Sequence, residues 1–252
     1  MEVRDKYGTI ESFSNLIEEE SGFIVEVEKT IERLKDSEIK GIQLYPRPNL
    51  DVLEDYKAEK LYYKYDILLA SYSVGKDIRE IEKQYKDIVP LVKRSWKLRQ
   101  DYVMLLHILS MGILLQADTN IFRNLANVVT ESKLNDFLID YLIGYKLTDY
   151  LPMSEHQFKW KRPYPFLDTI ISVAQTNKEE AVKQLKLYLT KKWYRGHSDT
   201  GWYNIHVINS GSHSGYWSFE SGALVKVLGL DDSSLKGVPY YPYDMVHWND
   251  TK

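Results

Sequence analysis

Histidines and carboxylates gather in one stretch of the last third of the chain, at His197, Asp199, His206, His213 and Glu220. These residue types bind catalytic metals, so the stretch raises the alternative of a metal-dependent hydrolase built on His197, His206 and His213. The spacing argues against it, because no pair has the four-residue step of an HExxH helix. Ligands nine and seven residues apart converge only if the fold brings them together. We therefore predict no bound metal and no cofactor, and keep the hydrolase as the alternative.

Nucleophilic and phosphate-binding motifs are missing as well. The chain has no GxSxG elbow, and SGSHSG at residues 210–215 lacks the lysine and the regular glycine spacing of a phosphate loop. It also has no cysteine, which excludes thiol catalysis, disulfides and zinc–thiolate sites and fits a reducing compartment. We expect no catalytic residues and a protein that is not an enzyme.

Composition points to a globular protein with a sizeable core. The 252 residues are 44% hydrophobic, and 33 basic residues against 36 acidic ones give a net charge of -3. Direct nucleic-acid binding needs clustered positive charge, so we do not expect it. The polar start MEVRDKYGTIESFS is not a signal peptide, and the most apolar stretch, residues 103–117, is shorter than the roughly 20 residues that span a bilayer. We expect a cytoplasmic protein with no membrane partner, and a homo-oligomer is left open.

Helical periodicity dominates the chain. Apolar residues recur at three- and four-residue steps over 9–35, 51–73, 76–99, 120–131, 134–146, 177–193 and 216–228, and 103–117 is expected to be a buried core helix. Thr9 should cap the first helix with Ser12 close behind it, and Pro90 should kink or split the third. The expected fold class is all-α, with two packed helical subdomains at 1–150 and 151–252. A short strand or hairpin near 202–208 is left open, and the tail PYYPYDMVHW is expected to be extended.

Five segments carry a resemblance to a known family. They are YSVGKDIREIEKQY at residues 72–85, WYNIH at 202–206, GYWSFE at 215–220, LGLDDSSLK at 228–236 and YYPYD at 240–244. These segments resemble the PoNi-like proteins, which give immunity to PoNe-type DNase toxins, and the resemblance spans residues 5–248. It implies an all-helical bacterial protein that binds the nuclease domain of its cognate toxin and neutralises it by stoichiometric complex formation.

The expected partner-binding face combines carboxylates and aromatic rings. A DNase holds phosphates and so presents a basic face, which carboxylates on a rigid surface attract, while Trp and Tyr supply contact energy. We predict that this face belongs to the C-terminal subdomain, with the N-terminal helices able to contribute. The predicted residues are Trp202, His206, Glu220, Asp231, Asp232, Tyr240, Tyr241 and Asp244.

Structural roles compete with this prediction for several residues. Trp217 and Phe219 are expected in the core, and Glu220 could equally satisfy a buried donor. Asp231 and Asp232 are expected to cap a helical turn, which alone stabilises by about 1 kcal/mol. The run Glu18 to Glu20 is expected to be a solvated helix face.

Overall fold

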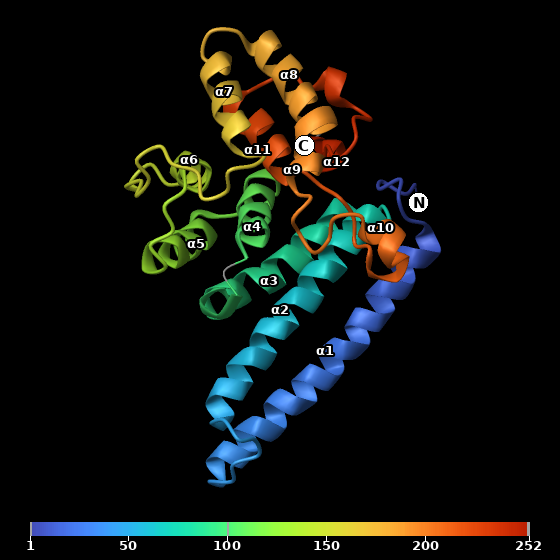
Figure 1. Ribbon diagram of the computed structural model, residues 1–252, viewed down its shortest axis with the longest axis vertical. Helices are drawn as coiled ribbons and strands as arrows, with labels where there is room; N and C mark the ends of the chain where they lie inside the picture. The colour runs from blue at the N-terminus through green and yellow to red at the C-terminus, as the bar shows by residue number, and fades with distance from the viewer. Residues whose placement is uncertain (1, 100, 251–252) are drawn as a thin grey trace. The chain divides into compact units, whose positions relative to one another are not determined.

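The structure is a computed structural model that describes residues 2–99 and 101–250, with side chains described outside 94–99. All regular secondary structure in these residues is helical, which confirms the all-α fold (Figure 1). Contacts divide the chain into two compact units: unit 1 holds Met1–Asp101 and Ile205–Gly215, and unit 2 holds Tyr102–Asn204 and Tyr216–Lys252. The boundary predicted at residue 150/151 is a different division of the chain and stays a prediction.

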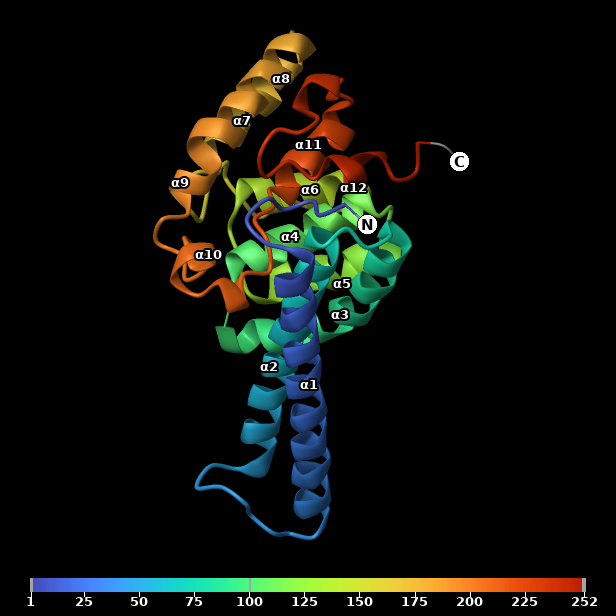
Figure 2. The same cartoon turned by 90° about the vertical axis from the view of Figure 1, so that its right-hand side faces the viewer.

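Unit 1 is built on three helices, α1 (Ile10–Ile39), α2 (Asn49–Ser73) and α3 (Ile78–Arg99). Helices α1 and α2 run side by side and are joined by a loop at one end (Figures 1 and 2). The expected cap is present, because Thr9 Oγ1 accepts from the Ser12 backbone at 3.1 Å while Ser12 Oγ accepts from the Thr9 backbone at 2.9 Å. This reciprocal pair satisfies two free N–H groups at the start of α1.

Two apolar clusters hold the hairpin of α1 and α2 together. Val27, Ile31 and Leu34 pack with Val52 and Leu53, and nearer the chain start Phe13 and Leu16 pack with Ala70 and Val74. Late residues of α1 therefore meet early residues of α2, so the two helices are antiparallel. At the loop, the buried Asn49 side chain accepts from Leu44 N at 3.0 Å and donates to Ile42 O at 2.7 Å.

Residues 205–215 return to unit 1 and contribute α10 (Ile205–Ile208) and a short 3-10 turn (Ser210–Ser212). Ser73 Oγ donates to Ser214 O at 2.8 Å, and Ser214 Oγ donates to Asp66 Oδ1 at 3.1 Å. Burial raises the pKa of Asp66 to about 6, against the lowering effect of the Ser214 bond. The return segment is thus anchored to α2 by side-chain hydrogen bonds.

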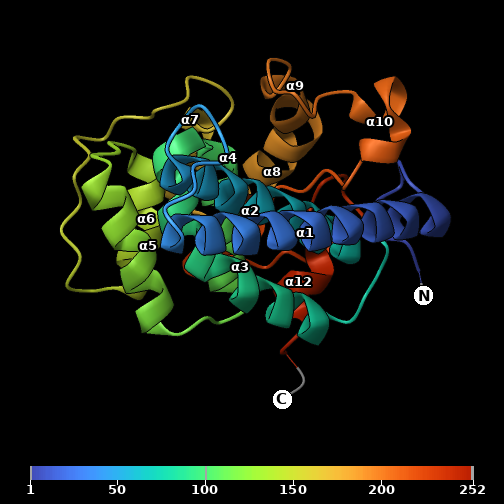
Figure 3. The same ribbon diagram turned by 90° about the horizontal axis from the view of Figure 1, so that it is seen from below.

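Unit 2 is organised around α4 (Tyr102–Leu114), whose residues are all buried, as expected for the apolar stretch. It packs against α5 (Thr119–Glu131), α6 (Phe137–Lys146) and α11 (Phe219–Leu228). Helices α5 and α6 lie next to each other (Figures 1 and 3). The remaining elements are α7 (Pro165–Ala174), α8 (Lys178–Leu187), a π-helical segment (Tyr188–Trp193), α9 (Tyr194–Gly196), a 3-10 turn (Ser233–Leu235) and α12 (Tyr243–His247).

One of the two outcomes expected at Pro90 is excluded, because α3 runs unbroken from Ile78 to Arg99 and the exposed Pro90 does not split it. Residues 202–208 form turns and α10 rather than a strand, and Asn204 at φ 59° interrupts any extended run. The tail is not extended throughout, since Pro242 accepts from Val246 N at 3.1 Å and α12 begins at Tyr243.

Among residues 2–99 and 101–250, no helix combines the length and the apolar character needed to cross a lipid bilayer.

Candidate partner-binding site

The GYWSFE segment builds the core of unit 2. Tyr216, Trp217 and Phe219 are 2%, 5% and 0% exposed, which confirms the expected core positions of Trp217 and Phe219. Ser218 N donates to Tyr240 O at 2.8 Å and ties this segment to the tail. The most distinctive part of the sequence therefore supports the fold of unit 2.

Glu220 lies in the same core and is 0% exposed. It accepts from Tyr188 OH at 3.0 Å and from Ser218 Oγ at 2.7 Å. Burial raises its pKa to about 7, against the lowering effect of these bonds. The expectation that Glu220 satisfies buried donors is confirmed, whereas a partner cannot reach this carboxyl in the folded protein.

Asp232 and Tyr241 form a second buried pair, each 4% exposed. Tyr241 OH donates to Asp232 Oδ2 at 2.5 Å, and His247 Nε2 lies 2.8 Å from Asp232 Oδ1. This contact joins the turn at Ser233–Leu235 to α12. The two side chains are internal, so the prediction that they touch a partner does not fit their positions.

The two neighbouring aspartates differ in role. Asp231 is exposed and its Oδ1 accepts from Ser233 N at 3.0 Å, which confirms a capping role. Hydrogen bonds from the Ser233 backbone and side chain lower the pKa of Asp231. Asp232 makes no side-chain capping bond, so the expected cap was wrong at this position, where the carboxylate bonds Tyr241 instead.

The predicted residues that remain accessible in unit 2 are Asp231, Tyr240, Asp244 and Trp202. Asp231 and Asp244 are exposed, while the two aromatic side chains are half-buried. Tyr240 stacks on Tyr194 with ring centroids 5.3 Å apart and planes 6° apart, and Trp202 stacks on Trp193 at 5.7 Å. These rings are held rigidly, which limits the entropy lost when a partner covers them.

His206 belongs to unit 1, where it is the second residue of α10. Its ring packs on the ring of Tyr7, with centroids 4.5 Å apart. Burial lowers its pKa, and the nearby His213 lowers it further. Its neighbours Val207 and Ile208 are each 74% exposed. His206 is therefore a half-buried residue of unit 1 and is not part of the ring cluster of unit 2.

The histidines of the hydrolase alternative have structural surroundings. His197 is buried between Tyr164 OH, 2.8 Å from Nε2, and Trp193 O, 2.7 Å from Nδ1, and burial lowers its pKa to about 4. His213 is buried 3.4 Å from Asp5. In the part of the chain that the structure describes, no group of three or more His, Asp or Glu residues is placed to hold a metal ion. The geometry gives the hydrolase no site.

An excess of negative charge lies on α1, outside the C-terminal subdomain to which the partner-binding residues were assigned. Residues 151–252 hold ten acidic and twelve basic residues, whereas α1 alone holds nine acidic and three basic ones. Glu18 and Glu19 are exposed, as expected for a solvated face, but Glu20 is half-buried. Counting charge by segment would have found α1, because the excess is visible in the sequence.

Comparison with known proteins agrees with the resemblance of the motifs. The family model described as PoNe immunity protein (PoNi), N-terminal, matches residues 4–127, and the one described as PoNe immunity proteins (PoNi), C-terminal, matches residues 134–245. A search of curated proteins finds no match.

Three chains among solved structures also match. One is the crystal structure of protein PA2201 from Pseudomonas aeruginosa, 22% identical, with a TM-score of 0.58 over 79% of this chain and 76% of that one. This likeness shows a shared fold. With both family models matched in order along nearly its whole length, the chain belongs to the PoNe immunity protein (PoNi) family, and it is an immunity protein that neutralises a nuclease toxin.

Proposed function

We propose that the protein acts in the cytoplasm by binding the nuclease domain of a PoNe-type DNase toxin in a stoichiometric complex, without turnover. The observation that carries this proposal is the tandem match to both parts of an immunity family. The polar groups that could do chemistry support it too, because Glu220, Asp232 and His197 are buried and bonded within the fold. Such groups stabilise a rigid binding surface.

Part of the contact surface in this proposal is the accessible set in unit 2, Asp231, Tyr240, Asp244 and Trp202. Rigid aromatic rings supply buried contact area, and the two exposed carboxylates favour a basic partner. Charge removal in the double variant D231N/D244N should weaken the complex and leave the unfolding midpoint nearly unchanged, because an asparagine at position 231 keeps the oxygen that accepts from Ser233 N. If the complex is equally strong, this surface is not part of the interface, while the family assignment is untouched.

Titration of nuclease activity separates a binder from an enzyme. The protein is co-expressed with candidate PoNe-type nucleases, and survival identifies the one it protects against. Purified protein is then titrated into that nuclease while DNA cleavage is followed. A stoichiometric binder gives a linear loss of activity that ends at a fixed molar ratio, and dilution of the complex restores cleavage. Inactivation by small substoichiometric amounts that grows with time would refute the proposal.

A further inference from the structure

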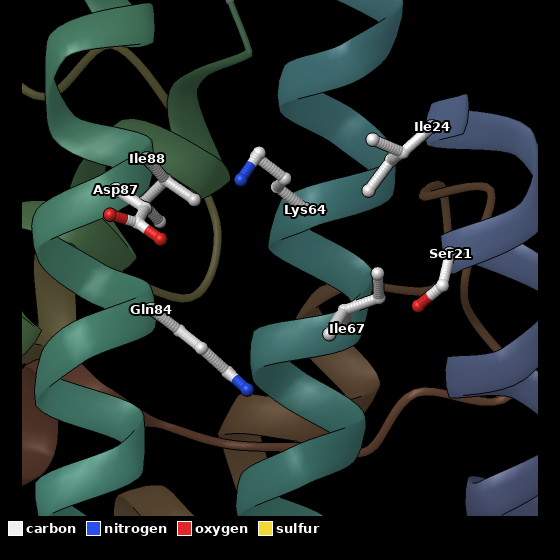
Figure 4. A pocket seen from close by; sticks show the side chains of 7 residues that line it. All are labelled: Ser21, Ile24, Lys64, Ile67, Gln84, Asp87 and Ile88. Carbon is white, nitrogen blue, oxygen red and sulfur yellow. The ribbon is translucent and has the colours of Figure 1, made fainter. Parts of the chain in front are cut away.

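Unit 1 contains a groove of about 230 Å³ between α1, α2 and α3. Figure 4 shows the side chains of the three helices turned toward it, with α2 in the middle. Ile24, Ile67 and Ile88, one from each helix, supply apolar surface, and Gln84 and Asp87 of α3 supply oxygen atoms. Such a groove, apolar with a few polar groups, suits a long side chain with a polar tip.

Two buried acceptors lie in or next to this groove. Gln84 Nε2 donates to Ser71 Oγ at 3.1 Å, but its Oε1 is buried and has no donor among the described residues. Glu20 Oε2 is likewise buried without a donor. Glu20 lies one helical turn before Ile24, on the same face of α1. Unpaired buried acceptors are costly, so a donor that reaches them gains more than an ordinary surface contact.

The electrostatic surroundings favour a positively charged donor. Burial raises the pKa of Glu20 to about 7, and the carboxyls of Asp66 and Glu19 raise it further. Asp87 adds a carboxyl group in the groove, and Lys64 is the ammonium group that lines it. Carboxyl groups thus outnumber the cation, and a second cation would relieve their mutual repulsion.

Exposed residues of α1 beside the groove continue this negative field. Glu18 and Val25 lie three residues before and four residues after the groove residue Ser21, so they share its edge of the helix, and Val25 is 49% exposed. Carboxylates around apolar side chains steer a basic protein to the surface and give it area to bury. The part of a DNase that holds DNA phosphates is rich in Lys and Arg.

We infer that the groove between α1, α2 and α3, together with the adjoining edge of α1 at Glu18 and Val25, is a docking surface for a Lys- or Arg-bearing segment of the toxin's nuclease domain. The inference rests on the proposed function and specifies where its electrostatic part lies. A guanidinium group fits best, because its five N–H donors can reach several oxygens at once. The cation inserts its stem along the isoleucines and places its charged end at the acceptors.

The test uses the full-length protein and the catalytically inactive form of the nuclease that it protects against in co-expression. At pH 8, above the raised pKa of Glu20, Glu20→Gln removes one charge beside the groove, and Glu32→Gln removes one from an exposed position further along α1. Ser21→Trp fills the groove, and Asn15→Trp adds the same ring at an exposed position of α1 outside it. Binding is measured by calorimetry, and circular dichroism checks that each variant is folded.

We expect Glu20→Gln to weaken the complex by about 10-fold or more and Glu32→Gln by about 2-fold or less, because only the first carboxylate meets the cation directly. Ser21→Trp should abolish measurable binding and Asn15→Trp should not. If Ser21→Trp does not fold, the pair of glutamine variants decides. Equal weakening by both glutamine variants, or none, overturns the inference while protection in co-expression keeps the proposed function. If the protein protects against no PoNe-type nuclease, the proposed function itself fails.

Discussion

The buried carboxyl of Glu220 gives unit 2 a stability that depends on pH. Its pKa rises from 4.5 to about 7 in the folded protein, mainly through burial. Between pH 4.5 and pH 7 the folded chain holds a proton that the unfolded chain releases. The stabilising contribution of Glu220 to the free energy of unfolding is therefore fully present below pH 4.5 and is lost as pH rises through 7. Each pKa unit corresponds to about 1.4 kcal/mol, so this one group accounts for about 3 kcal/mol.

The variant Glu220→Gln removes this titration and keeps an oxygen to accept from Tyr188 and Ser218. We expect the free energy of unfolding of the variant, relative to the natural chain, to rise by about 3 kcal/mol between pH 4 and pH 8. Urea unfolding followed by tryptophan fluorescence measures it, since five of the six Trp residues belong to unit 2. Titrations elsewhere in the protein cancel in the difference.

The control is Glu179→Gln, which changes an exposed carboxylate in the first turn of α8. Its free-energy difference from the natural chain should stay within about 0.5 kcal/mol over the same pH range. A pH-independent difference for Glu220→Gln would show that this carboxyl is not protonated in the folded protein, and the reasoning from burial would be refuted.

Three further changes test the structural roles of other residues. Trp217→Ala should cost about 3–5 kcal/mol by opening a cavity in the core of unit 2, seen as a lower urea midpoint. Tyr241→Phe removes the hydrogen bond to Asp232 and leaves a buried acceptor, so thermal unfolding should show a loss of about 1–3 kcal/mol; an unchanged midpoint would argue against the bond. Asn49→Ala frees two backbone groups of the loop between α1 and α2, and amide exchange of Leu44 should become faster than in the natural chain.

The sequence predicts most of the helices because their apolar spacing is local information. The wrong expectations come from places where distant contacts decide. The strand or hairpin left open at residues 202–208 does not form, and in the described chain no strand is present to pair with this segment. The tail PYYPYDMVHW is not extended beyond Pro242, because a proline is also compatible with the start of a helix.

Burial of the predicted site residues also depends on contacts that are distant in the sequence. Glu220, Asp231, Asp232 and Asp244 lie in one segment, and nothing local distinguishes the buried pair from the exposed pair. Burial of Glu220 depends on Tyr188, which is 32 residues earlier in the chain, and burial of Asp232 on a tyrosine nine residues later. The charge of α1 was readable from the sequence, but the groove requires three helices to be placed in space.

The path of the chain through the two units also determines how the protein can be divided. The polypeptide leaves unit 1 at Asp101 and re-enters it at Ile205 for one short segment before finishing in unit 2. A fragment ending near residue 101 would lack Ser214 and its bonds to α2, and a fragment starting there would carry residues 205–215 without their anchoring helix. No single proteolytic cut yields two intact halves, so exchanging one unit between relatives requires three crossover points, after residues 101, 204 and 215.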